Sequence, residues 1–240
     1  MTHFRNPSRK SPFSARRVRN LVAAFTASLV LGGCSAVNHV MYKTTGDVMQ
    51  GFSRDHTVPF LMESNDLAMG CAMSEATAPL LMSFGRVTNE PDQLAVMLYL
   101  SAGGCAEEEA REHELAALAA LNAMNGNEAE DAMIQQKRAH SVAARRYYKA
   151  WQHHNAHYGN PADGECPDFD DDMDEFIYMA GLLSGLQALN AQIQSTSSIG
   201  VPANVGSIAA RATSCLDNEK WWGAPMALRA TVWAVFTIHL

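Results

Sequence analysis

Ala143-Ala144-Arg145-Arg146-Tyr147-Tyr148-Lys149-Ala150-Trp151 is the middle of the longest helical pattern in this 240-residue chain. The pattern covers about residues 128–158 and is amphipathic, with basic residues near its centre. Gly159-Asn160-Pro161 ends it, because glycine and proline seldom continue a helix. A helix of this kind buries its apolar face against other elements, so it favours a protein of packed helices.

Helical patterns continue on both sides, whereas alternating strand patterns are almost absent. We expect further helices over residues 60–84, from Pro91 to Gly103-Gly104, over 107–123, 172–194 and 205–215, and from Pro225 onward. The turn Asn125-Gly126-Asn127 separates two of them. The sequence therefore predicts an all-α domain over residues 59–240, made of antiparallel helical hairpins in a tetratricopeptide-like array or a bundle.

Residues 1–33 have the composition of a secretory signal peptide. The apolar run over residues 21–31 is too short to span a membrane, which takes about 20 residues. It is preceded by a basic flank and followed by small residues and a cysteine: Arg16, Arg17 and Arg19, then Gly32-Gly33-Cys34.

Small residues followed directly by cysteine are typical of a bacterial lipoprotein. We predict that cleavage leaves Cys34 as a lipid-carrying N-terminus, followed by a lipid-anchored segment over residues 34–58. The alternatives are a cleaved signal without lipid, or the start of an ordinary core helix. Ser35 after the cysteine favours sorting to the outer membrane, on its periplasmic side.

The mature chain is strongly acidic. The whole chain has a formal net charge of −7, but residues 1–33 hold six basic residues and no acidic ones. Residues 34–240 therefore carry 12 Lys and Arg against 25 Asp and Glu, a net charge of −13. Such a surface repels nucleic acid and anionic lipid, so we expect membrane attachment through the lipid alone.

Four cysteines follow Cys34, and an even number in an exported protein suggests disulfides: Cys71, Cys105, Cys166 and Cys215. Three pairings are possible. We favour the pairing of sequence neighbours, because each bond could then close one helical hairpin. Buried free thiols are the alternative. No CxxC pattern supports a zinc or redox site.

A metal site is the main chemical alternative. His153 and His157 are four residues apart, so their rings can share one face of a helix. An acidic cluster over residues 168–175 could supply further ligands, with Asp170 and Asp172 as candidates. However, the cluster lacks the spacing of a calcium loop, and the histidines lack the zinc-protease glutamate. A solvated helix end and an acid-rich helix start explain both features.

Gly181 and Gly185 form a small-residue pair at helical spacing, which indicates close packing against a neighbouring helix. Trp221 and Trp222 precede a proline-started helix. Adjacent tryptophans can bury one ring and expose the other, so we expect a ligand or partner contact there, with two rings in the core as the alternative. Tyr147 and Tyr148 are further candidate contacts.

No nucleophile elbow, phosphate loop, dinucleotide fingerprint or zinc-protease motif occurs in the chain. We therefore expect no enzymatic activity and no cofactor.

The chain resembles the T-component family of TRAP transporters. The resemblance is carried by Leu31-Gly32-Gly33-Cys34, by residues 143–151, and by the acid, aromatic and glycine pattern of residues 174–185. It implies a helical periplasmic lipoprotein and a homo-oligomer, a trimer being favoured. It also implies a periplasmic substrate-binding protein as partner, with a small ligand handled between the two.

These observations together predict a non-enzymatic accessory component of a TRAP-type solute transport system, which holds or scaffolds a small molecule. The alternatives are a metal-binding protein or metal-dependent enzyme that uses His153, His157 and the acidic cluster, and a structural envelope lipoprotein.

Overall fold

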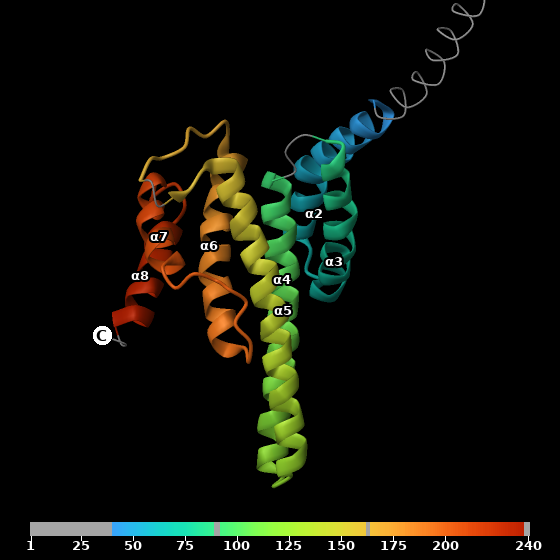
Figure 1. Cartoon of the computed structure of the whole chain (residues 1–240), viewed down its shortest axis with the longest axis vertical. Coiled ribbons are helices and arrows are strands. Elements are labelled where there is room, and N and C mark those ends of the chain that lie inside the picture. The colour runs from blue at the N-terminus through green and yellow to red at the C-terminus, as the bar shows by residue number, and fades with distance from the viewer. Residues whose placement is uncertain (1–39, 89–91, 162–163, 238–240) are drawn as a thin grey trace, which may run out of the picture.

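A computed structural model describes residues 40–88, 92–161 and 164–237, and every regular element in these ranges is a helix (Figure 1). The all-α prediction is therefore confirmed. Residues 1–33 and Cys34, the predicted signal peptide and lipidation site, lie outside the described residues.

The centre of the molecule is a long antiparallel hairpin of α4 (Asp92–Asn122) and α5 (Gly126–Tyr158) (Figure 1). These helices hold 31 and 33 residues. The connection is tight: Met124 has a left-handed φ of 57°, and the Asn125 side chain accepts the backbone N–H of Glu128 at the start of α5. The turn therefore ends at Asn125, and Gly126 already belongs to the helix.

The predicted helix end at Gly103-Gly104 is wrong, because α4 continues through both glycines. Gly103 instead allows close packing of α4 on α5. A Cβ at Gly103 would lie 2.5 Å from Cδ1 of Tyr147, which is far below van der Waals contact. The glycine is therefore required by the packing between the two helices rather than by a chain reversal.

Three helices follow the hairpin and lie along one side of it: α6 (Asp172–Gln194), α7 (Val205–Ala212) and α8 (Ala224–Thr237). A 3₁₀ turn, η4 (Thr213–Cys215), follows α7. Asp171 begins α6, since its carboxylate accepts the N–H of Asp174 at 2.8 Å. The predicted close packing at the glycine pair is confirmed. A Cβ would lie 2.1 Å from His154 at Gly181 and 2.6 Å from Trp151 at Gly185.

The N-terminal helices lie on the opposite side of the hairpin, at the end away from its tip (Figure 1). Residues 40–52 are helical and lead into the π-helical turn η1 (Ser53–Thr57), α2 (Val58–Glu63), α3 (Leu67–Ser83) and the 3₁₀ turn η2 (Phe84–Arg86). The single helix expected over residues 60–84 is broken at residues 64–66. Asp66 begins α3 there by accepting the N–H of Met69 at 2.9 Å.

The main hydrophobic core lies between α4, α5, α6 and the C-terminal helices, and includes Tyr147, Trp151, Tyr178, Leu182 and Trp221. A second cluster joins α2 and α3 to α4 through Val58, Leu81, Leu94 and Leu98. Helix lengths range from six to 33 residues. The architecture is therefore a bundle around one long hairpin, and not a stack of equal hairpins.

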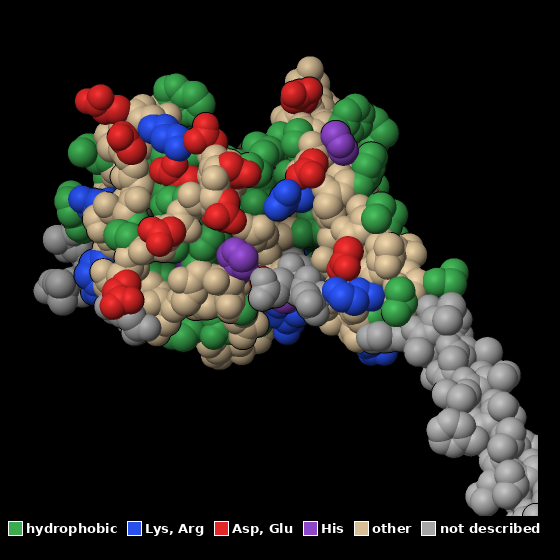
Figure 2. Space-filling view, turned by 90° about the horizontal axis from the view of Figure 1, so that it is seen from above, with side chains coloured by type: hydrophobic (Ala, Val, Ile, Leu, Met, Phe, Trp, Pro, Cys, Tyr) green, Lys and Arg blue, Asp and Glu red, His purple; other side chains and the backbone are tan. Residues whose placement is uncertain are grey.

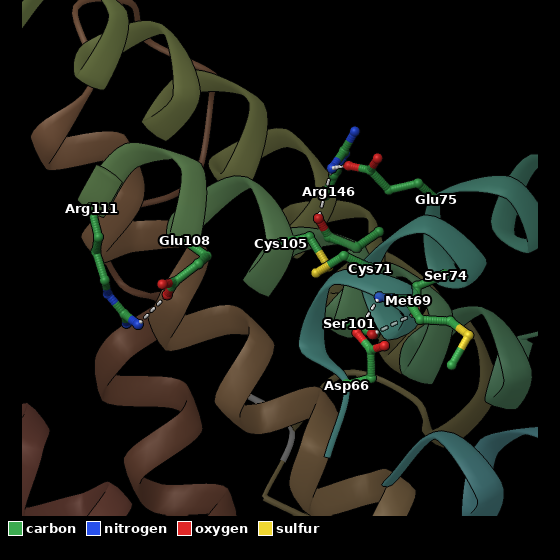
Figure 3. Close-up of a disulfide and its surroundings, with 11 residues drawn as sticks. Asp66, Met69, Cys71, Ser74, Glu75, Ser101, Cys105, Glu108, Arg111 and Arg146 are labelled. Atoms are coloured by element: carbon green, nitrogen blue, oxygen red, sulfur yellow. Dashed lines mark hydrogen bonds and ion pairs between the residues drawn. A yellow bond between two sulfur atoms is a disulfide. The ribbon is translucent and has the colours of Figure 1, made fainter. Parts of the chain in front are cut away.

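Both favoured disulfides are present, Cys71–Cys105 and Cys166–Cys215, with Cα–Cα distances of 5.4 and 5.3 Å. Cys71–Cys105 joins α3 to α4, beside the ion pair of Arg146 with Glu75 (Figure 3). The second bond does not close a helical hairpin, because Cys166 lies in the loop between α5 and α6. It fastens that loop to η4.

Candidate functional site

A cavity of about 890 Å³ opens between α7, η4, α8 and the loop that precedes α6. Its wall is mostly apolar and includes Val232 and Trp233 of α8 and the alanines of α7. The polar side chains in the wall are Glu165, Ser207, Arg211, Ser214 and Arg229. A predominantly apolar wall with a few polar groups is typical of a small-molecule site.

The Cys166–Cys215 disulfide joins two sides of this cavity. Cys215 lies in the wall, and Glu165 is the chain neighbour of Cys166. The bond therefore holds the loop against η4 at the cavity edge. A cavity closed by a covalent link is largely formed before a ligand arrives, which lowers the ordering cost of binding.

Two arginines give the cavity its charge. Arg229 donates from Nε and Nη2 to Oγ1 of Thr213, at 3.3 and 3.1 Å, and the buried Thr213 hydroxyl donates to the Ala210 carbonyl. Arg211 comes from the last turn of α7. Within the described residues neither guanidinium has a carboxylate partner, and Glu165 is the one acid in the wall. The cavity is thus positive on an acidic protein.

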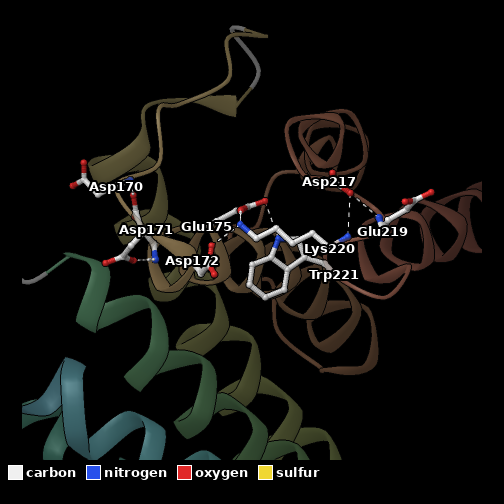
Figure 4. Close-up of polar contacts among 9 residues, drawn as sticks. Asp170, Asp171, Asp172, Glu175, Asp217, Glu219, Lys220 and Trp221 are labelled. Atoms are coloured by element: carbon white, nitrogen blue, oxygen red, sulfur yellow. Dashed lines mark hydrogen bonds and ion pairs between the residues drawn. The ribbon is translucent and has the colours of Figure 1, made fainter.

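The tryptophan pair forms a separate corner (Figure 4). The Trp221 ring is buried and its Nε1 donates to Glu175 at 2.8 Å, whereas Trp222 is 90% exposed. Trp222 and Gly223 have φ values of 50° and 84°, so a tight left-handed turn presents the exposed ring. Of the two arrangements that the sequence left open, the structure therefore has the one with a buried and an exposed ring. Neither ring lines the 890 Å³ cavity.

Lys220 ties this corner to the start of α6. Its ammonium pairs with Asp172 at 2.7 Å and also with Glu175 (Figure 4). These carboxylates raise the pKa of Lys220, and its backbone N–H is accepted by Asp217. The contacts hold the 217–223 turn on α6, and the turn therefore has a fixed orientation.

The candidate metal ligands do not come together. His153 Nδ1 lies 2.6 Å from Oδ1 of Asp92, and the His157 ring packs edge-on against Tyr158. Asp172 pairs with Lys220. In the described ranges no group of three or more His, Cys, Asp or Glu could hold a metal ion, so Asp170 and Asp172 gain no histidine partner.

Internal donors occupy much of the acidic cluster. The buried Asp174 accepts hydrogen bonds from Gln93 at 2.6 Å, Tyr158 at 2.5 Å and the N–H of Asp170 at 3.0 Å. Burial and the Asp174 carboxylate raise the pKa of Tyr158 well above its usual value of 10.0. The cluster thus joins α4, α5 and α6, and its oxygens are structural acceptors.

Of the two tyrosines that we expected as further contacts, Tyr147 is not available to a ligand or partner. The Tyr147 ring is buried between α4 and α5, and its hydroxyl donates to Glu107 at 2.7 Å. Burial raises the pKa of this hydroxyl. Tyr147 is therefore a core residue and is corrected as a contact candidate, because a ligand cannot reach it. Tyr148 is partly buried against the same core.

Sequence reasoning missed the two arginines and the role of His154. Arg211 and Arg229 belong to different short helices, and only the chain reversal at residues 213–223 brings them to one cavity. His154 is fully buried, stacked on Trp151 and packed near Tyr178. Its spacing of three residues from Trp151 is the one sequence signal that places it on the core face.

No known protein family, curated protein or solved structure matches this chain. One described helical stretch, Leu67–Arg86, is long and apolar enough to cross a membrane by length and composition, a test that core helices of soluble proteins also pass.

Proposed function

We propose that this chain is a non-enzymatic periplasmic lipoprotein that holds a small, largely apolar anion in the cavity between α7, η4, α8 and the Cys166 loop. In this proposal Cys34 carries the lipid and favours the outer membrane. The protein serves as an accessory component of a TRAP-type transport system, in line with the resemblance of residues 143–151 and 174–185. The expected partner is a periplasmic substrate-binding protein.

The observation that carries the proposal is a pair of arginines in the wall of an apolar cavity, for which the described part of the chain offers no carboxylate partner. A volume of about 890 Å³ lies within the usual range for ligand sites, roughly 300–1,000 Å³. The apolar wall favours a hydrocarbon or aromatic body. Arg211 and Arg229 favour a carboxylate or phosphate, because guanidinium groups match such anions in charge and geometry.

Assembly and partner binding need an exposed contact residue, and Trp222 is a candidate. An almost fully exposed tryptophan on a fixed turn is a suitable anchor for a protein contact. We place the contact with the substrate-binding protein, or with further copies in a trimer, at this corner.

The test uses octanoate, with octanol as the uncharged comparison, and isothermal titration calorimetry. We expect octanoate to bind the mature protein and Arg211→Ala/Arg229→Ala to weaken it at least about tenfold, because a lost charged hydrogen bond costs about 1.5–3 kcal/mol. Octanol should bind both proteins alike. Arg138→Ala is the matched control, because this exposed arginine of α5 lies outside the cavity wall.

Binding of octanol as tight as that of octanoate would contradict the role of the arginines. No binding of either compound would contradict the ligand-holding function and favour a structural envelope lipoprotein.

A further inference from the structure

The N-terminal helical segment, residues 40–63, leaves one side uncovered. Large hydrophobic side chains lie exposed along it, and Figure 2 shows such side chains along the flank of the molecule beside the grey N-terminal trace. Extended exposed apolar patches on a protein mark contact with another molecule or with a membrane.

Four of these side chains form a stripe: Met41, Val48, Phe52 and Phe60, each between 56 and 64% exposed. Their spacings are seven, four and eight residues. Spacings of seven and four return to one face of a helix with 3.6 residues per turn. The spacing of eight spans the π-helical turn Ser53–Thr57, whose wider turn takes up the additional residue and brings Phe60 back to the same face.

The opposite face of the segment already has its partners. Gly46 is buried, and a Cβ there would collide with Thr88 and Phe84. Gln50 donates to Thr88 Oγ1 at 2.8 Å, and Val58 is buried in the cluster of α3 and α4. One face of the segment therefore packs on the rest of the protein, and the stripe lies on the opposite, uncovered face.

Both basic residues of this segment pair with acidic residues within it. Lys43 contacts Asp47 at 3.2 Å, and Arg54 contacts Asp55 at 2.8 Å. Residues 40–63 carry two basic and three acidic residues, whereas residues 64–240 carry ten and 22. The segment that carries the stripe is therefore close to neutral, with a net charge of −1, so an anionic membrane repels it only weakly.

The short chain between Cys34 and the stripe limits the distance between the stripe and a lipid on Cys34. Cys34 precedes Val40 by six residues. At most about 3.6 Å per residue, these residues keep Val40 within roughly 20 Å of Cys34. A lipid on Cys34 would therefore hold the stripe close to the bilayer surface, so a membrane is the first partner that the stripe meets.

We infer that residues 40–63 lie along the bilayer surface, with Met41, Val48, Phe52 and Phe60 in the interface between headgroups and acyl chains. The inference rests on the proposed lipid anchor at Cys34 and adds a second attachment to it. Amphipathic helices of this kind bury their apolar face by about 5–10 Å. The paired charges of the segment stay at the level of the headgroups.

The test removes the lipid and asks whether the stripe binds by itself. The protein is the mature chain, residues 34–240, with Cys34→Ser, and the probe is phosphatidylcholine vesicles in a co-sedimentation assay. We expect partition into vesicles, and a loss of at least about tenfold for Val48→Glu/Phe52→Glu, because each change removes apolar contact and adds a charge. Leu115→Glu/Leu118→Glu is the control, since both are exposed apolar residues of α4 outside the stripe.

Equal partition of both glutamate variants, or no partition of the parent, would overturn the inference. Light scattering tests whether the stripe instead contacts a second copy of the chain. That would be the result if the parent is a dimer that does not bind vesicles and Val48→Glu/Phe52→Glu is a monomer. Thermal melting of each variant confirms that it is folded. The anchor is judged separately by cell fractionation of the Cys34→Ser chain, so a failed anchor and a failed stripe give different results.

Discussion

His154 packs directly on Gly181: a Cβ at Gly181 would lie 2.1 Å from Cδ2 of the histidine. This contact fixes the distance between α5 and α6 at the centre of the main core. The imidazole is fully buried, and among the described residues its Nε2 has no hydrogen-bond partner. Because the contact depends on the absence of a methyl group, it can be tested with the smallest side-chain change.

Gly181→Ala should destabilise the protein by about 1–3 kcal/mol, the usual cost of an overpacked core. The measurement is the free energy of unfolding from urea titration. Gly70→Ala in α3 is the control, because nothing lies within 4 Å of a Cβ there. It should be neutral or stabilising by up to about 1 kcal/mol through helix propensity. Equal effects of the two changes would argue against the close contact.

His154 should also make stability depend on pH. Burial lowers its pKa from 6.5 to about 4 in the folded protein. Between these values the unfolded chain binds a proton that the folded chain excludes. The free energy of unfolding should therefore fall as the pH falls from 6.5 to 4, by on the order of 3 kcal/mol.

Urea titrations at several pH values measure this dependence. His154→Leu should reduce the slope by nearly one proton. A slope that stays the same in His154→Leu would show that the histidine does not carry the effect.

The disulfides should leave no free thiol among the four cysteines after residue 34. Thiol counting on the unreduced, denatured mature protein checks this. Cys71→Ser/Cys105→Ser should lower the free energy of unfolding by about 2–4 kcal/mol, because the bond restricts the unfolded chain. Four reactive thiols would be incompatible with the pairing described.

Substitution of the buried tryptophan should mainly lower stability, and substitution of the exposed one should mainly weaken assembly or partner binding. Trp221→Ala should cost about 3–5 kcal/mol, because it removes a core ring and leaves Glu175 without its Nε1 donor. Trp222→Ala should leave the melting temperature nearly unchanged and weaken assembly or partner binding by about 2 kcal/mol. Thermal melting and light scattering on both variants decide it. Unaltered assembly in Trp222→Ala would remove the proposed contact.

Cys34→Ser should move the protein from the membrane fraction to the periplasmic fraction, or at least make it extractable under milder conditions, because the lipid is the stronger attachment. Fractionation with immunodetection measures this. Identical fractionation of parent and variant would refute the anchor.

Local signals predicted much of the fold. The bounds of α6 agree with the expectation, because Asp171 and the acids after it cap its start and a small-residue linker follows its end. The expectation failed at Gly103 and at residues 64–66. Gly103 stays helical because its missing side chain makes room for Tyr147, a contact that periodicity does not contain. The break at residues 64–66 falls on the polar run Glu63-Ser64-Asn65-Asp66, where Asp66 caps α3, and the expected single helix did not take this local signal into account.

The candidate site was less predictable than the fold. Cysteine count and order correctly favoured Cys166–Cys215. The tryptophan pair at residues 221–222 left open whether one ring or neither is exposed, and the structure exposes one. Arg211 and Arg229 belong to no sequence motif, and they line one cavity only because α8 packs on α7. His153 and His157 had metal-ligand spacing, but Asp92 and Tyr158 contact them instead.

The length of α5 has a mechanical consequence. Its 33 residues extend over about 50 Å at 1.5 Å per residue, and the tip of the α4–α5 hairpin points away from the N-terminal helices (Figure 1). In the proposed attachment of the N-terminal segment to the bilayer, the α4–α5 hairpin would act as a spacer. It would hold its tip up to several nanometres from the lipid surface.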